Sequence, residues 1–314
     1  MLLPTAFADE NIFIAYRNPT IDYFSERYIK WHLPNHLLCS QTCCVNFWFI
    51  FMHEPDYLAE VLRDLGYPVA EMLEFEFDSL DSLQSMGWRV ARQPSDIDLG
   101  SSARRRGYLA FEWVGARNYL RELSFGAVAG DVNRSRGQYF TSIDVAVRFR
   151  RTDGLTQIVL IEWKYTEKYR IGRSLRFSAK GTDRLDQIYR TSLEAPDCQV
   201  VLNGISPEAL FFDPFDQMMR HQLLASAMER GWEMGASIVS YLHIAPRANS
   251  ELLQRITSPD LQSRGGDIHE IWRSMVRDDR FQSVYTEDLL PIVIAHAPDN
   301  EWARYLNLRY GGLA

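Results

Sequence analysis

Two β-rich runs joined by a tight turn constrain this chain more than any other feature of its sequence. Residues 140–149 and 157–165 are rich in β-branched and aromatic side chains, and the segment between them contains Asp153-Gly154, a strong hairpin signal. The second run carries apolar residues at even and odd positions, which is typical of a strand buried on both faces. The sequence therefore predicts an antiparallel hairpin in the middle of a sheet.

The length of the turn decides which side chains face each other across this hairpin. A two-residue turn would set Asp144 against Trp163, on the wrong face for Glu162. A three-residue loop over 152–154 sets Asp144 directly against Glu162, with Cβ atoms about 5 Å apart. Because that loop needs a left-handed residue at its last position, which Gly154 supplies, we predict the three-residue loop.

The acids at the end of this hairpin predict a metal site. Glu162 and Lys164 lie two apart and share one face of the strand. Carboxylates as close as Asp144 and Glu162 repel each other, and a divalent cation between them resolves the repulsion. Their hard oxygen donors suit Mg²⁺ or Mn²⁺, which activates water and neutralises phosphodiester charge. Lys164 would orient or deprotonate that water, or stabilise the developing charge. The alternative is a structural salt bridge among these three residues.

The same residues carry a resemblance to a known superfamily. Ser142-Ile143-Asp144 and Glu162-Trp163-Lys164 resemble the two halves of the PD-(D/E)XK motif of restriction endonuclease-like nucleases, with Ile143 in place of the motif's proline. The chain looks most like an uncharacterised bacterial group within that superfamily. The similarity spans roughly residues 35–245 and includes further segments, namely Leu37–Gln41, Asn46, Asn118–Glu122, Thr141, Tyr165–Glu167 and Gln217–Leu224.

The resemblance implies a fold, an activity and roles for named residues. It implies an αβββαβ core and metal-dependent cleavage of phosphodiester bonds. Asp144, Glu162 and the Trp163 carbonyl would bind the metal, and Lys164 would act as base or charge stabiliser. The family often adds an acid upstream, for which Glu122 is the first choice and Glu112 the second. Each residue also has a non-functional interpretation: Glu122 would be a surface acid, and Glu112 would occupy an exposed strand position.

The remaining elements predict an α/β fold with a mixed central sheet flanked by helices. We expect a single domain over 1–314, with a core over about 35–245, a C-terminal elaboration over 246–314 and four or five strands. Residues 107–115 favour a strand over a helix because they are aromatic and bounded by glycines. The other expected elements are helices over 37–65, 183–193, 215–230, 268–277 and 301–309, strands over 199–202, 210–212 and 237–244, and a surface excursion over 71–106.

Composition and charge indicate the cellular compartment of the protein and the partners it could bind. The chain has 314 residues and a net charge of −7, four cysteines suit a reducing compartment, and the N-terminal segment does not resemble a signal peptide. No apolar run is long enough for a membrane helix, so we expect a cytoplasmic protein. Residues 164–190 hold eight basic and three acidic side chains. This basic segment would contact phosphates, or would form a solvated loop and helix face.

Together these features favour a Mg²⁺- or Mn²⁺-dependent nuclease that acts on DNA, in preference to RNA, in restriction, defence or repair. The alternative is a catalytically inactive module with the same fold that binds nucleic acid or a protein partner. Double-strand cutting would suit a homodimer or a partner subunit of a defence system. On the helix over 215–230, Gln217, Arg220, His221 and Gln222 form a polar cluster that would contact phosphate or position the metal's water, or would form a surface face.

Overall fold

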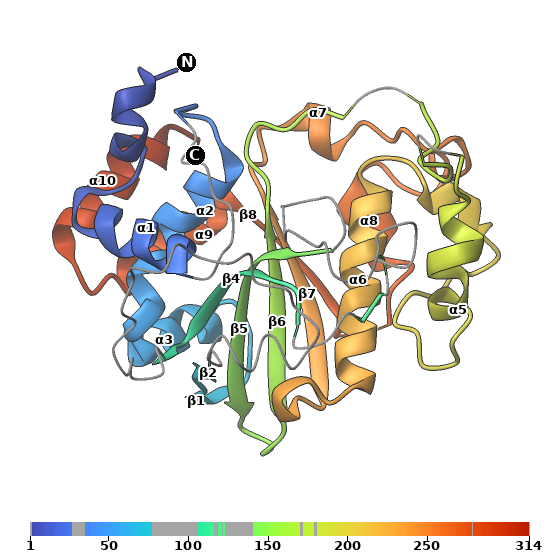
Figure 1. The fold of residues 1–314 in the computed structure, drawn as a ribbon, viewed down its shortest axis with the longest axis horizontal. Helices are drawn as coiled ribbons and strands as arrows, with labels where there is room; N and C mark the ends of the chain where they lie inside the picture. The colour runs from blue at the N-terminus through green and yellow to red at the C-terminus, as the bar shows by residue number, and fades with distance from the viewer. Residues whose placement is uncertain are drawn as a thin grey trace, which may run out of the picture.

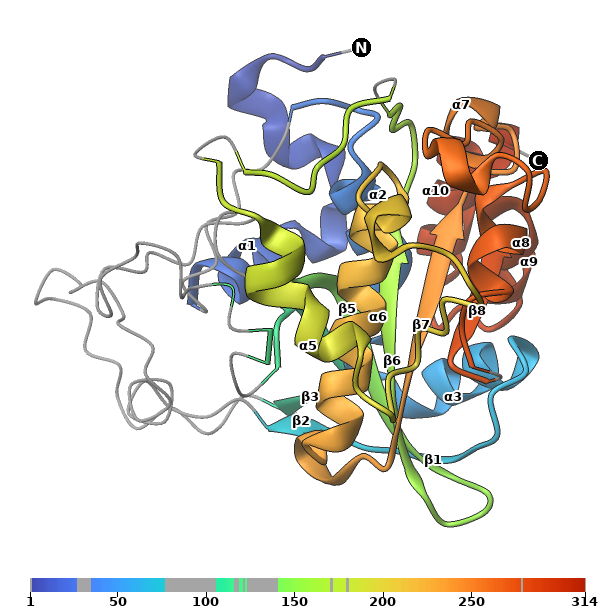
Figure 2. The same ribbon diagram turned by 90° about the vertical axis from the view of Figure 1, so that its right-hand side faces the viewer.

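A six-stranded mixed sheet forms the centre of the protein, and helices cover both of its faces (Figures 1 and 2). This arrangement confirms the predicted α/β class with a mixed central sheet flanked by helices. The computed structural model describes residues 2–26, 35–76, 106–115, 119, 120, 122, 141–169, 172–178, 181–277 and 279–313.

The strands of the central sheet follow the order β1-β5-β6-β7-β8, and β4 also pairs with β5. They are β1 (Val69–Met72), β4 (Leu109–Trp113), β5 (Ile143–Arg151), β6 (Thr156–Trp163), β7 (Ile238–Ala245) and β8 (Phe281–Tyr285), and β2 (Phe75–Glu76) and β3 (Arg106–Gly107) form a separate pair. The expectation of four or five strands was too low, because the short β1 and the edge strand β8 lack a clear apolar alternation. The strand expected over 107–115 is confirmed as β4.

The helices form two layers. The α-helices are α1 (Arg17–Glu26), α2 (Ser40–Trp48), α3 (Pro55–Asp64), α5 (Arg190–Leu193), α6 (Phe215–Arg230), α7 (Ser250–Leu253), α8 (Ile268–Arg273), α9 (Thr286–Ala295) and α10 (Asn300–Tyr310). A π-helix, Leu185–Tyr189, precedes α5, and short 3-10 turns occupy Thr5–Asn11, Ile14–Tyr16, Phe49–His53, Pro207–Leu210, Glu233–Gly235, Pro259–Leu261 and Gly311–Leu313. Figure 1 shows α1, α2, α3, α9 and α10 on one side of the sheet and α5, α6 and α8 on the other.

The hairpin between β5 and β6 has the predicted register. Val145 lies opposite Ile161 and Arg150 opposite Thr156, and the Arg151 amide donates to the Leu155 carbonyl. The loop between them therefore has three residues, and its last residue, Gly154, has a φ of 84°. The left-handed conformation that the sequence required at this glycine is present.

Strand β6 is buried on both faces, as its apolar pattern predicted. Val159, Ile161 and Trp163 pack into the core beneath the α2, α3, α9 and α10 layer. Ile158 and Leu160 pack into the second core, beneath α6 and α8. Strand β6 pairs antiparallel with β5 and parallel with β7, so its end lies between the two helical layers.

Two expected strands are absent. Gln199–Leu202 contributes only an isolated bridge between Val200 and Val276, and Leu210 ends a 3-10 turn that begins at Pro207. Burial explains the apolar character of both segments, because Val200, Leu210 and Phe211 pack into the core beneath α6. Short apolar runs do not distinguish strands from buried turns.

Helix length bears on the expectation that the protein does not enter a membrane. Across the described ranges, no helix combines the length and the apolar character that crossing a bilayer requires. The longest α-helix, α6, has 16 residues and carries several charged side chains.

We predict that Gly154→Ala destabilises the protein by about 1 kcal/mol through backbone strain alone. A Cβ added at Gly154 meets no atom within 4 Å, so the cost comes only from the left-handed φ. Gly312→Ala is the matched control, because a Cβ there also meets open space and its φ is not positive. Urea denaturation measures both variants, and equal stability of the two would contradict the strain.

Candidate active site

The predicted acids lie on neighbouring strands, Asp144 near the start of β5 and Glu162 near the end of β6. This end of β6 lies between α2 and α6 (Figure 1). The paired residues of β5 and β6 end at Val145 and Ile161, and one position further in the same register sets Asp144 against Glu162. Asp144 Oδ2 accepts a hydrogen bond of 2.8 Å from the Trp163 amide. Asp144 and Glu162 are 8% and 4% exposed, so both carboxylates lie inside the protein.

Lys164 joins this group through Glu162. Its ammonium donates to Glu162 Oε1 at 2.6 Å, and the lysine is 7% exposed. Helix α6 supplies two further neighbours, because Gln217 Nε2 donates to the same oxygen at 2.8 Å and His221 Nε2 lies 3.6 Å from Glu162 Oε2. The polar cluster predicted on this helix therefore faces the acids with Gln217 and His221, rather than solvent.

Electrostatics keep the lysine charged and the histidine neutral. Burial lowers the pKa of Lys164, but the negative charges of neighbouring carboxylates, Glu162 foremost and then Asp144, raise it more, so its pKa lies above the ordinary value. Burial, with the charges of Arg220 and Lys164, holds the pKa of His221 well below its ordinary value. Before any metal binds, the site thus contains an ammonium and a neutral imidazole around Glu162.

Glu112 stands next to Asp144 on the other side of β5. Its flanking residues Phe111 and Trp113 pair with Val145 and Ile143, which sets Glu112 against Asp144 in the same register. Glu112 is 5% exposed and has a φ of 50°, a left-handed conformation that costs a side-chain-bearing residue on the order of 1–2 kcal/mol. Such conformations concentrate at functional sites.

Two polar side chains hold the Glu112 carboxylate. Ser142 Oγ donates to its Oε2 at 2.9 Å, and Gln41 Nε2, from α2, donates to its Oε1 at 2.5 Å. Sequence reasoning gave neither residue a role. Both lie in segments that carry the family resemblance, so the signal was present, but only the fold shows that they meet at Glu112.

Glu122, the first choice for the upstream acid, has other partners. It accepts hydrogen bonds from the Thr141 amide at 2.6 Å, the Thr141 hydroxyl at 2.9 Å and the Tyr189 hydroxyl at 2.7 Å. Thr141 also accepts from Arg220 of α6 at 3.3 Å. Glu122 thus fixes the start of β5 against the α5 and α6 layer, whereas Glu112 stands opposite Asp144.

The pKa of the buried Cys44 thiol on α2 is sensitive to the acids of this site. Burial is the largest cause of the raised pKa of Cys44, followed by the charges of neighbouring groups, which include Asp144, Glu162 and Glu112. These three carboxylates therefore lie close enough to the middle of α2 for their charge to act on Cys44.

The donor chemistry of this site fits a hard divalent cation. Its carboxylate oxygens, together with a backbone carbonyl, are the ligands that Mg²⁺ and Mn²⁺ prefer. The side chains are turned toward other partners, since Glu162 bonds Lys164 and Asp144 bonds the Trp163 amide. Within the described residues, no set of three or more His, Cys, Asp or Glu side chains is already arranged around a metal position.

Three arginines of the basic segment after β6 form internal ion pairs. Arg176 pairs with Asp183 at 2.7 Å, Arg184 with Asp216 at 2.9 Å, and Arg190 with two acids. Lys168 and Arg173 are exposed, and Arg170 and Lys180 lie outside the described residues. Because these three arginines are already paired with acids, the prediction of a loop and helix face fits them better than the prediction of phosphate contact.

A comparison with protein-family models matches nearly the whole chain. The matching model, REase-ARP, carries the description "Restriction Endonuclease associating with ARP" and matches residues 1–113 and 116–311. No curated protein and no solved structure matched the chain.

We predict that the buried histidines make the protein less stable as the pH falls below about 6.5. Burial lowers the pKa of His269 to about 4 and that of His243 well below its ordinary value. Between pH 6.5 and 4 the unfolded chain binds protons that the native protein excludes, so stability present above pH 6.5 is lost on acidification, by about 1.4 kcal/mol per pH unit for each histidine.

Denaturant unfolding between pH 4 and 7 measures this slope. His269→Gln should reduce the slope by about one proton. An unchanged slope in His269→Gln would show that His269 titrates normally in the native protein.

We further predict that removing one member of the buried Glu162–Lys164 pair destabilises more than removing both. Lys164→Met leaves the Glu162 carboxylate buried without its ammonium, at a cost of about 3 kcal/mol. The double variant Glu162→Gln/Lys164→Met should lose less, because no unpaired charge remains. A double-mutant cycle in urea with EDTA present checks this, and strictly additive losses would disprove the coupling.

Proposed function

The chain belongs to the REase-ARP family of restriction endonucleases that associate with ARP, and we propose that it cleaves DNA by metal-assisted hydrolysis at Asp144, Glu162 and Lys164. Membership confirms the inferred restriction endonuclease-like relationship and indicates a nuclease-like function with an associated partner. One observation carries the finer proposal: the hairpin register brings two buried carboxylates together beside a buried ammonium.

Asp144 and Glu162, with the Trp163 carbonyl, are the residues that would hold Mg²⁺ or Mn²⁺. When bound, such an ion supplies an activated water and neutralises charge on the phosphodiester. The repulsion between two carboxylates opposed on neighbouring strands favours binding of this ion. Within the trio, Lys164 bonds Glu162 directly and remains charged beside it.

The charged state of Lys164 supports a role in stabilising charge rather than in removing a proton. An ammonium at the end of β6 places positive charge where the phosphate becomes more negative during attack. Gln217 donates a hydrogen bond to Glu162 from α6, and the neutral His221 lies 3.6 Å from the other carboxylate oxygen without adding charge. These two side chains would orient Glu162 while Lys164 acts on the substrate.

We propose Glu112, in preference to Glu122, as the upstream acid. Glu112 lies across β5 from Asp144, and Gln41 and Ser142 fix its carboxylate. Its left-handed backbone conformation is a strain that a purely structural strand position has no reason to retain. A carboxylate held there would complete the oxygen ligands on the β4 side of the site.

We expect Asp144→Asn, Glu162→Gln and Lys164→Met each to reduce cleavage by at least about a hundredfold, because each removes a ligand or the charge beside it. Glu112→Gln should cost about tenfold or more, and the isosteric Glu122→Gln should cost less. Purified protein is incubated with single- and double-stranded DNA and with RNA, in Mg²⁺, Mn²⁺ or EDTA. Titration calorimetry of Mn²⁺ into wild type and Asp144→Asn tests metal binding separately.

Glu251→Gln, which alters an exposed ion pair with Arg255, is the matched control and should cleave as the wild type does. Cleavage that survives Asp144→Asn or Lys164→Met would exclude this site. Wild type that binds DNA without cutting it or binding Mn²⁺ would instead support the inactive module. If Glu122→Gln loses more activity than Glu112→Gln, the upstream acid is Glu122.

A further inference from the structure

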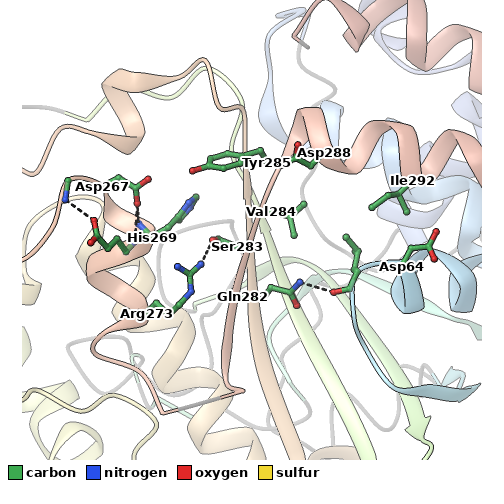
Figure 3. Close-up of a pocket in the computed structure, with 13 residues that line it drawn as sticks. Asp64, Asp267, His269, Arg273, Gln282, Ser283, Val284, Tyr285, Asp288 and Ile292 are labelled. Carbon is green, nitrogen blue, oxygen red and sulfur yellow. Dashed lines mark hydrogen bonds between the residues drawn. The ribbon is translucent and has the colours of Figure 1, made fainter.

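A groove lies along the free edge of the sheet, away from the acids at the end of β6. This open groove has a volume of about 660 Å³, and Gln282, Ser283, Val284 and Tyr285 of β8 line its floor (Figure 3). One wall comes from α8 and the loop before it, and the other from α9 and the end of α3. The groove thus straddles the edge of the sheet and includes residues from both helical layers.

The outer edge of β8 carries backbone groups that no other strand of the described sheet pairs with. In the described sheet, β8 pairs with β7 alone, in parallel. The Tyr241 amide donates to the Arg280 carbonyl, so in a parallel ladder 280, 282 and 284 face β7. The backbone groups of Phe281 and Ser283 therefore point outward, where an added strand would meet them.

The side chains of β8 alternate between the two walls, as those of an added strand would. Ser283 accepts a hydrogen bond from Arg273 of α8 at 2.8 Å, and Gln282 donates to the Leu65 carbonyl beyond α3 at 2.8 Å. These contacts join each wall to β8. A bound strand would accordingly place alternate side chains against α8 and against α9.

The charge of the walls selects the occupant. Asp267 and Glu270 lie on the α8 side and Asp64 and Asp288 on the other, against the single guanidinium of Arg273. Arg247 pairs with Asp288 at 2.6 Å, and acids remain in excess even with it. Nucleic acid is repelled by this lining, and so is a second copy of the same acidic edge, whereas an extended segment with basic side chains is attracted.

We propose that the β8 edge is the docking site for an extended, basic segment of the protein partner with which this family associates. This inference rests on the proposed function, which includes an associated partner. It adds to that function the surface that binds the partner and the chemistry of the bound segment. The partner segment adds a strand beside β8, its backbone bonds the outward groups of Phe281 and Ser283, and its basic side chains meet the acidic walls.

The test uses two fluorescein-labelled peptides of sequence Thr-Lys-Val-Lys-Val-Lys-Val-Lys-Thr and its counterpart with Glu for Lys, titrated with the full chain by fluorescence anisotropy. We expect the lysine peptide to bind and the glutamate peptide not to bind. Ser283→Pro removes one outward amide and should weaken binding about five- to tenfold. Ser283→Ala is the matched control, because it removes the hydroxyl and keeps the amide.

A second pair of changes does not disturb the backbone. Asp267→Asn/Glu270→Gln keeps the acceptors that serve the start of α8 and the Gly266 amide, and removes two charges. It should weaken lysine-peptide binding about tenfold at low salt and less at high salt. These variants lie outside the proposed active site and should cleave DNA as the wild type does, so loss of docking is distinguishable from loss of catalysis.

Equal binding of the lysine peptide by wild type, Ser283→Pro and the charge variant would overturn the proposal, and so would no binding by wild type. A wild-type dimer in sedimentation that dissociates in Ser283→Pro would overturn it in favour of a second copy at this edge. Absence of cleavage by wild type, together with selective lysine-peptide binding, would sink the nuclease proposal and support the docking site.

Discussion

The pairing of β5 with β6 is the interaction on which the rest of this structure depends. The three-residue loop that closes at Gly154 sets the register of the hairpin, and the register decides whether Asp144 faces Glu162 or the opposite layer. A slip by one residue would bury the carboxylate among the aromatic side chains beneath α2. The same pairing positions β4 and β7 on either side, so that Glu112 and the helix α6 reach the acids from opposite directions.

Buried charge imposes the second constraint, because each carboxylate at the end of the sheet must find partners inside the protein. Residues from both helical layers meet this need: Gln41 of α2 bonds Glu112, and Gln217 of α6 bonds Glu162. The acids thereby connect two cores that are otherwise separated by the sheet. Stability alone does not account for this arrangement, since well-packed apolar side chains of similar volume are often as stable.

The sequence determined the hairpin, α6 and β7 because their signals are local: a glycine turn, a 16-residue helix and an apolar run. Strand β8 and helix α9 escaped prediction, because an edge strand such as Phe281–Tyr285 is half-exposed at every position and shows no alternation. Asp144, Glu162 and Lys164 could be grouped from spacing alone. The place of Glu112 could not, because its left-handed conformation and its contacts with Gln41 and Ser142 arise only from the assembled fold.

The histidines beneath the groove link the edge of the sheet to its centre. His269 of α8 and His243 of β7 lie 2.9 Å apart between ring nitrogens, and His243 stands beside Glu162 in the β6–β7 register. All three residues are buried, so α8 has no compressible or hydrated layer between it and the carboxylate. The two imidazoles therefore pack α8 directly onto the strand pair that contains Glu162, so the position of this helix and the surroundings of that carboxylate depend on each other.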